Sequence, residues 1–442
     1  MRRLLPVLAL GTLLLTALPA HATQDGPAHR ESYGTKAPYA PRQGRHGYQQ
    51  APAGFVPVFT ENVSRHGSRA ASDSDDADLV LALWDQARAE DRLTGLGREF
   101  GPKARALQAA MAKVGYGNLS GRGRRELADT AVRLERRLPA LFTKIAADGE
   151  RIDMVSSGQG RAVDSGTEFT AALAAADPEL KPLIGPARTD KDLLYFHKAA
   201  GGAAYRDYIE HDQRLKDTLD GITGRPKTLK AAHSVLRKLF QEPFVARIAD
   251  PVGAARAVYD LYAIAPAMSE ESPEGRGWGM ERFLSPADAA WFGYLSDAED
   301  FYEKGPGFAG SDITYKMADV LLDDFFRQAE AKRAGTSDLG AELRFSHAEE
   351  IIPLAALMGL PGSTEPAAPD EPYTYAGNSW RGASVSPLGA NIQWDVFAKG
   401  DRYLVRMLYN EKETAFKEGC RPVAEGSAFY DLDELERCFG RR

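Results

Sequence analysis

The chain has 442 residues, of which 43% are hydrophobic and 26% are charged, and its formal net charge is −7. These proportions are typical of a globular protein, and they exclude general disorder, a collagen-like fibre and a miniprotein held together by disulfides. Because acidic residues are in excess and no long run of Lys or Arg occurs, we expect no nucleic acid as a partner. A small anionic ligand is compatible with this composition, and the length favours two domains.

The first 22 residues have the pattern of a secretory signal peptide. Arg2 and Arg3 precede an apolar run over residues 4–18, and Ala20-His21-Ala22 supplies the small residues of a cleavage site. We predict cleavage after Ala22 and secretion into the periplasm or the extracellular space. A membrane anchor is the alternative, but the run is shorter than the roughly 20 apolar residues that a spanning helix needs. After cleavage we expect no association with a membrane.

Residues 23–50 are rich in Gly, Pro, Gln and charged residues and show no apolar period. We therefore expect a flexible or surface-draped N-terminal extension. Beyond it, short apolar runs that end where polar residues begin predict strands at residues 55–59, 152–155 and 342–345. Leucine and alanine at three- and four-residue spacing predict helices at residues 79–92, 123–147, 227–240 and 313–334.

Strands separated by long helical stretches predict an α/β layer. The largely helical block over residues 181–335 predicts an inserted, mostly α-helical cap domain, so the α/β core would consist of residues 51–180 and 336–442. Residues 181–238 contain 12 Lys and Arg against seven Asp and Glu, which gives the start of the insertion a basic face. The alternative reading of this face is an ordinary solvated helical surface.

Cys420 and Cys438 are the only cysteines, and they lie 18 residues apart near the C-terminus. An exported protein meets an oxidising environment, so we predict one disulfide between them. Closing a loop of this size would stabilise the fold by about 3 kcal/mol through restriction of the unfolded chain. Two free buried thiols are the alternative, and they would require a reducing compartment.

A candidate anion site follows the first predicted strand, where Arg65 and Arg69 bracket His66 and Gly67. Loops at the carboxyl edge of an open α/β sheet commonly hold ligands. Guanidinium groups bind phosphate oxygens in bidentate fashion and stay charged, and a glycine lets backbone and ligand approach closely. A neutral imidazole between them can attack phosphorus and carry the phosphoryl group covalently. An isolated histidine is more often structural, but the flanking arginines favour a phosphate site.

The segment Arg65-His66-Gly67-Ser68-Arg69 resembles the RHGxR signature of the histidine phosphatase superfamily, in its histidine acid phosphatase and phytase branch. Two further segments fit that branch in the expected order, Ser157-Gly158-Gln159-Gly160-Arg161 and Phe345-Ser346-His347-Ala348-Glu349. The His-Ala-Glu form, together with residues 405–411 ahead of the two cysteines, is similar to the multiple inositol polyphosphate phosphatases. One departure is Ala71, where members of the family usually have proline.

The resemblance implies a phosphoglycerate-mutase-like α/β core with a helical cap, and it implies roles for single residues. These are His66 as nucleophile, Arg65, Arg69 and Arg161 as phosphate clamps, His347 as a further phosphate ligand and Glu349 as proton donor. Three arginines can stabilise the phosphoryl oxygens without a metal ion, and no cluster of ligands has metal-binding spacing, so we expect no metal and no cofactor. Arg161 has a structural alternative as an ion-pair partner of Asp164, although its place beside a helix start suits anion binding.

Glu349 also has a structural alternative. Ser346-His347-Ala348-Glu349 fits the Ser-x-x-Glu capping box, in which the glutamate only accepts a backbone N–H at a helix start. Pro353 argues against this reading, because a helix that began at His347 would hold a proline in its interior. We therefore expect the helix to begin near Glu350 and Glu349 to act as the proton donor, which an alkoxide leaving group requires.

The sequence thus predicts a secreted phosphomonoesterase that hydrolyses inositol polyphosphates, including phytate, through a phosphohistidine intermediate. A substrate with many phosphates needs contacts beyond the scissile one, and basic residues of the insertion are candidates for such a rim: Lys191, Lys198, Lys227, Lys230, Arg237 and Lys238. One alternative is a broad-specificity acid phosphatase acting on sugar phosphates or nucleotides. Another is a phosphate-binding protein without turnover, against which the retained nucleophile and donor argue. The oligomeric state is left open, with a monomer favoured.

Overall fold

The computed structural model describes residues 30–441 apart from 276 and 369. The predicted signal peptide lies outside the described residues. Within them, none of the helices combines the length and the apolar character that crossing a bilayer demands.

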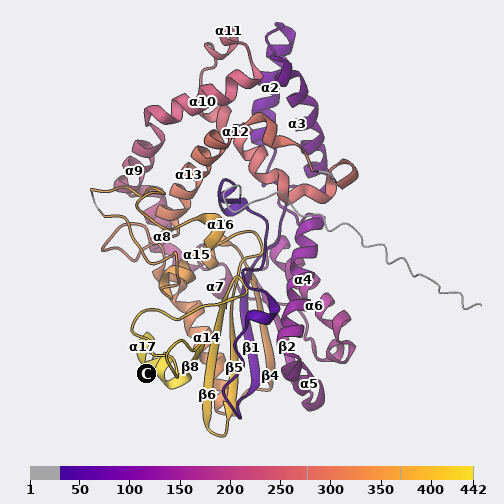
Figure 1. The fold of residues 1–442 in the computed structure, drawn as a ribbon, viewed down its shortest axis with the longest axis vertical. Coiled ribbons are helices and arrows are strands. Elements are labelled where there is room, and N and C mark those ends of the chain that lie inside the picture. Colours follow the sequence, from indigo (N-terminus) through magenta and orange to yellow (C-terminus); the bar gives the residue numbers. More distant parts are fainter. Residues whose placement is uncertain (1–29, 276, 369, 442) are drawn as a thin grey trace, which may run out of the picture.

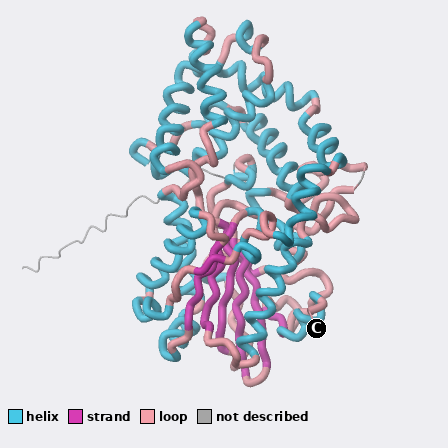
Figure 2. Tube along the Cα trace, turned by 180° about the vertical axis from the view of Figure 1, so that it is seen from behind, coloured by secondary structure: helices cyan, strands magenta, loops and turns pink. Residues whose placement is uncertain are grey.

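A mixed sheet forms the centre of the protein (Figures 1 and 2). Four strands are parallel: β1 (Val56–Arg65), β2 (Arg151–Ser156), β3 (Arg188–Thr189) and β4 (Leu339–Ser346). Antiparallel strands extend the sheet beyond β1: β5 (Asn391–Lys399), β6 (Arg402–Tyr409), β7 (Lys412–Glu413) and β8 (Phe429–Asp431). The order across the sheet is β3-β2-β4-β1-β5-β6-β7, and β8 also pairs with β6. The predicted α/β fold class is confirmed.

Strand β1 is longer than the pattern predicted, because its second half is polar and yet buried. Glu61 is 0% exposed and accepts a hydrogen bond of 2.9 Å from Nη2 of Arg344 on β4, which also pairs with Asp324. Burial raises the pKa of Glu61 to about 8. The buried guanidinium of Arg344 satisfies polar groups that would otherwise interrupt a strand, so β1 continues as far as Arg65.

Helices cover both faces of the sheet (Figure 1). One face carries α4 (Gly121–Arg137), α5 (Pro139–Asp148) and α6 (Gly160–Ala176), and the other carries α14 (Asp319–Arg333), α15 (Ala348–Leu357) and α17 (Leu432–Phe439). The single helix expected over 123–147 is two helices, because Pro139 starts a new helix directly after Leu138. Proline is well tolerated at a first helical position and poorly tolerated in an interior.

A helical region lies beyond the carboxyl edge of the parallel strands (Figures 1 and 2). Its larger helices are α2 (Asp75–Ala89), α3 (Gly95–Val114), α8 (Ala203–His211), α9 (Gln213–Thr223), α10 (Pro226–Leu239), α12 (Pro251–Ile264) and α13 (Pro286–Glu303), and its short ones include α7 (Lys191–Leu194) and α11 (Glu242–Val245). Helices α2 and α3 precede β2 in the chain but pack against α12 and α10. The region is therefore assembled from two stretches of sequence, and the boundaries of core and cap stay a prediction.

Residues 30–40 of the N-terminal extension are packed rather than draped, whereas residues 41–50 are mostly exposed. Tyr33, Ala37 and Tyr39 are buried, and the hydroxyl group of Tyr39 donates a hydrogen bond of 2.8 Å to Glu411. The expected surface-draped course was wrong for residues 30–40, because isolated aromatic residues anchor this stretch without any apolar period. It runs between the helical region and the sheet, next to the short helix α16 (Gly382–Val385) (Figure 1).

The predicted disulfide between Cys420 and Cys438 is confirmed, with the two Cα atoms 5.3 Å apart. It joins the segment after β7 to α17, at the end of the molecule away from the helical region (Figure 1).

Candidate active site

Three parallel strands that are neighbours in the sheet end at one edge, and each of the three sequence motifs follows one of these ends. In the register of β1 and β4, Arg65 lies opposite Ser346, and in the register of β2 and β4, Ser156 lies opposite Phe345. Segments far apart in sequence therefore meet at the carboxyl edge, as expected for an open α/β sheet.

His66 is the first residue after β1, and it is 2% exposed. Its Nδ1 lies 3.0 Å from the carbonyl oxygen of Gly67. Because a carbonyl oxygen can only accept a hydrogen bond, Nδ1 carries the proton and Nε2 keeps its lone pair. Burial lowers the pKa of His66 well below its ordinary value, and the charges of Arg65 and Arg69 lower it further. Both effects favour a neutral imidazole, in which Nε2 keeps its lone pair.

Helix α4 packs against the loop after β1 and fixes its position. Glu126 of α4 accepts hydrogen bonds from the backbone N–H of Ser68 at 2.8 Å and from its hydroxyl group at 2.9 Å. A Cβ atom on Gly67 would lie 2.5 Å from Leu127 and 2.6 Å from the carbonyl oxygen of Gly123. We expected this glycine to admit a ligand, but in the structure it admits α4, and it thereby sets the position of the loop.

The guanidinium groups of Arg65, Arg69 and Arg161 gather around His66. Each of the three lowers the pKa of His66, and Arg161 also lowers the pKa of the other two arginines. Burial lowers the pKa of Arg65 and of Arg69 to about 10, so both stay charged at neutral pH. The structure thus concentrates three positive charges around one neutral histidine.

These three arginines keep hydrogen-bonding capacity that the protein does not use. In each of them, Nε is buried and has no partner among the described residues. Arg65 is held through Nη1, which donates to the carbonyl oxygens of Thr35 at 2.6 Å and Ser386 at 2.5 Å. A buried donor without a partner costs about 1–3 kcal/mol. Three such donors at one place are typical of a site that an anion completes.

Arg161 is the second residue of α6, and the first turn of this helix joins the same cluster. Ser165, one turn later, accepts a hydrogen bond of 3.2 Å from the N–H of Gly67 and donates one of 2.7 Å to the carbonyl oxygen of Arg161. The partial positive charge of a helix N-terminus adds to that of the guanidinium groups. The alternative partner, Asp164, forms no ion pair with Arg161 in the described part of the chain.

Helix α15 begins at Ala348, with His347 as its N-cap residue. Glu350 accepts the backbone N–H of His347 at 3.1 Å, which is the glutamate's role in a capping box. The expected start near Glu350 was therefore wrong. Pro353 lies inside the helix, where its missing N–H removes one backbone hydrogen bond, that to the carbonyl oxygen of Glu349. Because Glu350 is the capping residue, the capping alternative for Glu349 is removed.

The imidazole ring of His347 faces that of His66, with 5.5 Å between the ring centroids. Its Nε2 lies 2.8 Å from Oγ of Ser157, and its Nδ1 is buried without a partner in the described part of the protein. Burial lowers the pKa of His347 to about 3, and Arg161 adds to this effect. A neutral His347 that accepts a hydrogen bond from Ser157 keeps an Nδ1–H for an anion.

Glu349 lies near the same cluster, since it raises the pKa of both Arg65 and Arg69. Its side chain is 31% exposed, and its Oε1 lies 4.0 Å from Nζ of Lys304 at the end of α13. Burial raises the pKa of Glu349, but nearby positive charges, Lys304 first among them, outweigh burial and hold it at about 2. The unliganded protein therefore has an ionised Glu349 at neutral pH. Sequence reasoning missed Lys304, because no motif surrounds it.

His197 and Tyr195 were also missed. Nδ1 of His197 lies 2.7 Å from Glu350, and the ring of Tyr195 lies 4.5 Å from that of His197 and 5.2 Å from that of His347. Burial raises the pKa of Glu350 to about 7, and the hydrogen bond from His197 opposes this rise. These contacts join the stretch after α7 to the first turn of α15. The only signal in the sequence is a histidine two residues after a tyrosine, which is too common to be specific.

The candidate basic rim is spread over the helical region. Lys191 lies beside the loop that precedes α6 and Arg161, since a Cβ atom on Gly158 would meet its Cε at 3.6 Å. Four candidates, Lys227, Lys230, Arg237 and Lys238, lie on α10, in the upper part of the helical region (Figure 1). The ammonium of Lys227 stacks over the ring of Trp291, and Arg237 pairs with Glu242 at 2.5 Å.

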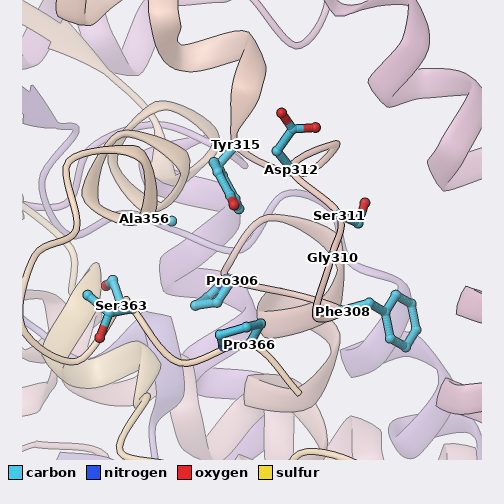
Figure 3. Close-up of a pocket in the computed structure, with 10 residues that line it drawn as sticks. Pro306, Phe308, Gly310, Ser311, Asp312, Tyr315, Ala356, Ser363 and Pro366 are labelled. Atoms are coloured by element: carbon cyan, nitrogen blue, oxygen red, sulfur yellow. The ribbon is translucent and has the colours of Figure 1, made fainter. Parts of the chain in front are cut away.

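A separate cavity of about 360 Å³ lies by the last turn of α15 (Figure 3). Pro306, Tyr315, Ala356 and Pro366 are among its lining residues, and no predicted site residue is. The predicted site residues of α15 lie at its first turn instead. No group of three His, Cys, Asp or Glu side chains within the described residues is arranged to hold a metal ion.

Residues 59–410 match the family described as the histidine phosphatase superfamily (branch 2). The chain belongs to this family. It is therefore a phosphomonoesterase, and the resemblance stated from its motifs is confirmed.

Individual relatives agree with this assignment. A crystal structure of Bifidobacterium longum multiple inositol polyphosphate phosphatase in complex with inositol hexasulfate superposes with a TM-score of 0.86 and 31% identity, over 92% of this chain and 97% of that one. Multiple inositol polyphosphate phosphatase 1 of Gallus gallus is 25% identical over 402 residues, which cover 88% of this chain and 84% of the relative. A thiamine-repressible acid phosphatase of Schizosaccharomyces pombe is 26% identical over 321 residues, covering 66% of this chain and 60% of the relative.

Proposed function

We propose that the protein is a secreted phosphatase of inositol polyphosphates, including phytate, and that it acts through a phosphohistidine on His66. The observation that carries the proposal is the buried neutral imidazole of His66 among three guanidinium groups whose Nε atoms have no partner in the described protein. A dianionic phosphoryl group would satisfy those donors. Nδ1 of His66, held by the carbonyl oxygen of Gly67, directs Nε2 to phosphorus.

In the first step, Nε2 of His66 attacks phosphorus and an N–P bond forms while the P–O bond to the alcohol breaks. Arg65, Arg69, Arg161 and the Nδ1–H of His347 bind the phosphoryl oxygens as charge develops on them. The proton of Glu349 passes to the departing alkoxide, which would otherwise return. The hydrogen bond from Nδ1 of His66 to Gly67 stabilises the positively charged phosphohistidine.

In the second step, a water molecule attacks the phosphoryl group, an O–P bond forms and the N–P bond breaks. Glu349, now a carboxylate, takes the proton of this water, which restores the starting protonation of both residues. The same carboxyl group thus acts as acid in the first step and as base in the second.

The low pKa of Glu349 in the unliganded protein sets a condition on the first step. A bound phosphomonoester carries about two negative charges, and negative charge near a carboxylate raises its pKa. We expect the substrate to raise the pKa of Glu349 far enough for it to be protonated at acid pH. His66 stays neutral there, because its own pKa is lowered. Activity on alkyl phosphates is therefore expected to be highest in the acid range.

Two observations support inositol polyphosphates as the substrate class. Relatives that cover 88% and 92% of this chain are named multiple inositol polyphosphate phosphatases, and one of them was solved with inositol hexasulfate. Lys191 lies beside the loop that precedes Arg161, and we expect a neighbouring phosphate to bind there. Export is supported by the signal-peptide pattern of residues 1–22 and by the disulfide.

A broad-specificity acid phosphatase is the second candidate, because a relative from Schizosaccharomyces pombe is named an acid phosphatase. The two are separated by measuring phosphate release from phytate, a glucose phosphate and an aryl phosphate between acid and neutral pH. Preference for phytate in kcat/KM supports the proposal, and equal values favour the broad enzyme. No release from any of them would favour a binding protein without turnover.

The nucleophile is tested with His66→Ala, which should abolish release from all three substrates. His233→Ala, on α10 and outside the cluster, is the matched control and should keep full activity. Full activity of His66→Ala would contradict the covalent mechanism.

A further inference from the structure

Thr35, a residue of the N-terminal extension, contacts Arg65 of the candidate site directly and is connected to Glu349 through two further residues. Thr35 lies in the turn Gly34–Lys36, and its carbonyl oxygen accepts the 2.6 Å hydrogen bond from Nη1 of Arg65. Its hydroxyl group donates a hydrogen bond of 2.9 Å to Oδ2 of Asp300 on α13. The backbone of Thr35 therefore contacts the phosphate clamp Arg65, and its side chain begins a series of polar contacts with other residues.

This series of contacts leads to Glu349. The other oxygen of Asp300, Oδ1, accepts a hydrogen bond of 2.6 Å from Nζ of Lys304, and the same Nζ lies 4.0 Å from Oε1 of Glu349. The side chains of Asp300 and Lys304 are 13% and 16% exposed, so water screens these charges little. Thr35, Asp300, Lys304 and Glu349 thus form one sequence of polar contacts.

Lys304 is shared among carboxylates, so its position depends on how each of them is held. Besides Asp300 and Glu349, its Nζ lies 3.8 Å from Glu303. Asp300 is the closest of the three, and the hydroxyl group of Thr35 is what fixes the far oxygen of Asp300. If that hydroxyl group is lost, we expect the carboxylate of Asp300 to turn and Lys304 to move with it.

The turn that carries Thr35 is itself held firmly. Lys36 pairs with Asp260 of α12, and a Cβ atom on Gly382 would lie 2.8 Å from the backbone nitrogen and from Cγ2 of Thr35. Gly34 has a φ of 54°, a conformation that glycine adopts readily. The hydroxyl group is therefore presented from a fixed backbone.

We propose that Thr35 is a positioning residue for proton donation by Glu349: it holds Asp300, which holds Lys304 against Glu349, while its carbonyl oxygen holds Arg65. This inference rests on the proposed function, in which Glu349 protonates the leaving group. Thr35 touches neither of the reacting groups, and its effect passes through Asp300 and Lys304. A loss of the hydroxyl group should therefore affect substrates in proportion to their need for a proton donor.

The test compares Thr35→Val with Thr35→Ser on an alkyl phosphate and on an aryl phosphate. The valine variant keeps the shape and the carbonyl oxygen of Thr35 and lacks the hydroxyl group, whereas the serine variant keeps both polar groups. We expect kcat/KM of Thr35→Val to fall about tenfold on the alkyl phosphate and less than about twofold on the aryl phosphate, whose leaving group departs without a proton. Thr35→Ser should restore the wild-type ratio. An equal loss on both substrates, or no recovery in the serine variant, would overturn the inference.

A double-mutant cycle makes the test independent of how well one variant folds. Asp300→Asn should show the same selective loss, and adding Thr35→Val to it should cause no further loss, because both act through one chain. If the losses in kcat/KM multiply in the double variant, Thr35 and Asp300 do not act through the same series of contacts. An equal fall in kcat/KM of Asp300→Asn on both substrates would refute the inference as well. If Glu349→Gln is selective and Thr35→Val is not, this inference fails alone. If Glu349→Gln is itself unselective, the proposed proton donor fails, and this inference with it.

Discussion

In the proposed active site, the phosphate side consists of four residues that lie at the end of β1, in the loop after it and in the first turn of α6: Arg65, His66, Arg69 and Arg161. The leaving-group side, formed by Glu349, Lys304, Asp300 and Thr35, comes from three segments of the chain that no motif connects. The first side is dense in positive charge, while the second pairs one ammonium with several carboxylates. A phosphoryl group is the same in every substrate, whereas leaving groups differ. We therefore expect substitutions on the phosphate side to affect all substrates, and substitutions on the leaving-group side to affect only substrates that need a proton donor.

The largest expected effect lies on the phosphate side. Arg161→Ala should lower kcat/KM by about 10³-fold on alkyl and aryl phosphates alike, because it removes a charge that stabilises the phosphoryl oxygens whatever the leaving group. Arg124→Ala is the matched control, since Arg124 is an exposed arginine of α4 that pairs with Glu168. A fall in kcat/KM on only one class of substrate would contradict the division of the site into a phosphate side and a leaving-group side.

Glu349→Gln should give the next largest effect, and a selective one. We expect kcat/KM to fall about 10²-fold on an alkyl phosphate and only a few-fold on an aryl phosphate, because only the alkoxide needs a proton. Both rates are to be measured at the same acid pH, with the exposed Glu418→Gln as the control. Equal losses on the two substrates would assign Glu349 to binding rather than to proton donation.

Lys304→Met should lower kcat/KM on an alkyl phosphate by about tenfold, as expected for Thr35→Val, and it should also shift the pH profile. Lys304 lowers the pKa of Glu349, so its removal raises that pKa and keeps the donor protonated to higher pH. The alkaline limb of kcat on an alkyl phosphate should therefore move upward by about one pH unit. Lys316→Met, an exposed lysine with 74% of its side chain accessible, should leave the limb in place. A downward shift would contradict the assigned electrostatics.

The smallest effect on activity is expected from the disulfide, which lies outside both sides. Replacing Cys420 and Cys438 by serine should lower the free energy of unfolding by about 3 kcal/mol, as measured with denaturant, because the unfolded chain gains freedom. kcat/KM should stay within about twofold of wild type. A changed ratio between alkyl and aryl substrates in this variant would mean that the disulfide segment couples to the site.

The phosphate side could be predicted from sequence because its residues directly follow strands. Once β1, β2 and β4 are parallel neighbours, their carboxyl ends meet, and the motifs need no further information to come together. The tautomer of His66 and the reason for Gly67 were not predictable, because both depend on contacts with the backbone and with α4.

On the leaving-group side, only Glu349 was predicted; the prediction came from the His-Ala-Glu resemblance, and the argument used against its structural alternative was wrong. Pro353 was taken to exclude a helix start at His347, but the helix begins directly after His347 and contains the proline. The better signal was the second glutamate of the motif. Counting from His347 as N-cap places Glu350, and not Glu349, at the capping position.

Thr35, Asp300 and Lys304 carried no signal, because their contacts are tertiary. The composition of the extension indicated little regular structure, which agrees with residues 30–50, but it did not predict burial. The polar second half of β1 likewise gave no signal of a strand. In both cases a polar residue that the sequence pattern predicts to be exposed is hydrogen-bonded to a specific partner inside the protein. Thr35 is bonded to Asp300, and Glu61 is bonded to Arg344.

Trapping of the covalent intermediate tests the central claim most directly. The protein is mixed with radiolabelled phytate, quenched within milliseconds in alkali and digested, and the labelled peptide is mapped. We predict an alkali-stable, acid-labile phosphohistidine on His66, with phosphorus bonded to Nε2, and no label in His66→Ala. Turnover without any covalent label, or a label on another residue, would contradict the account.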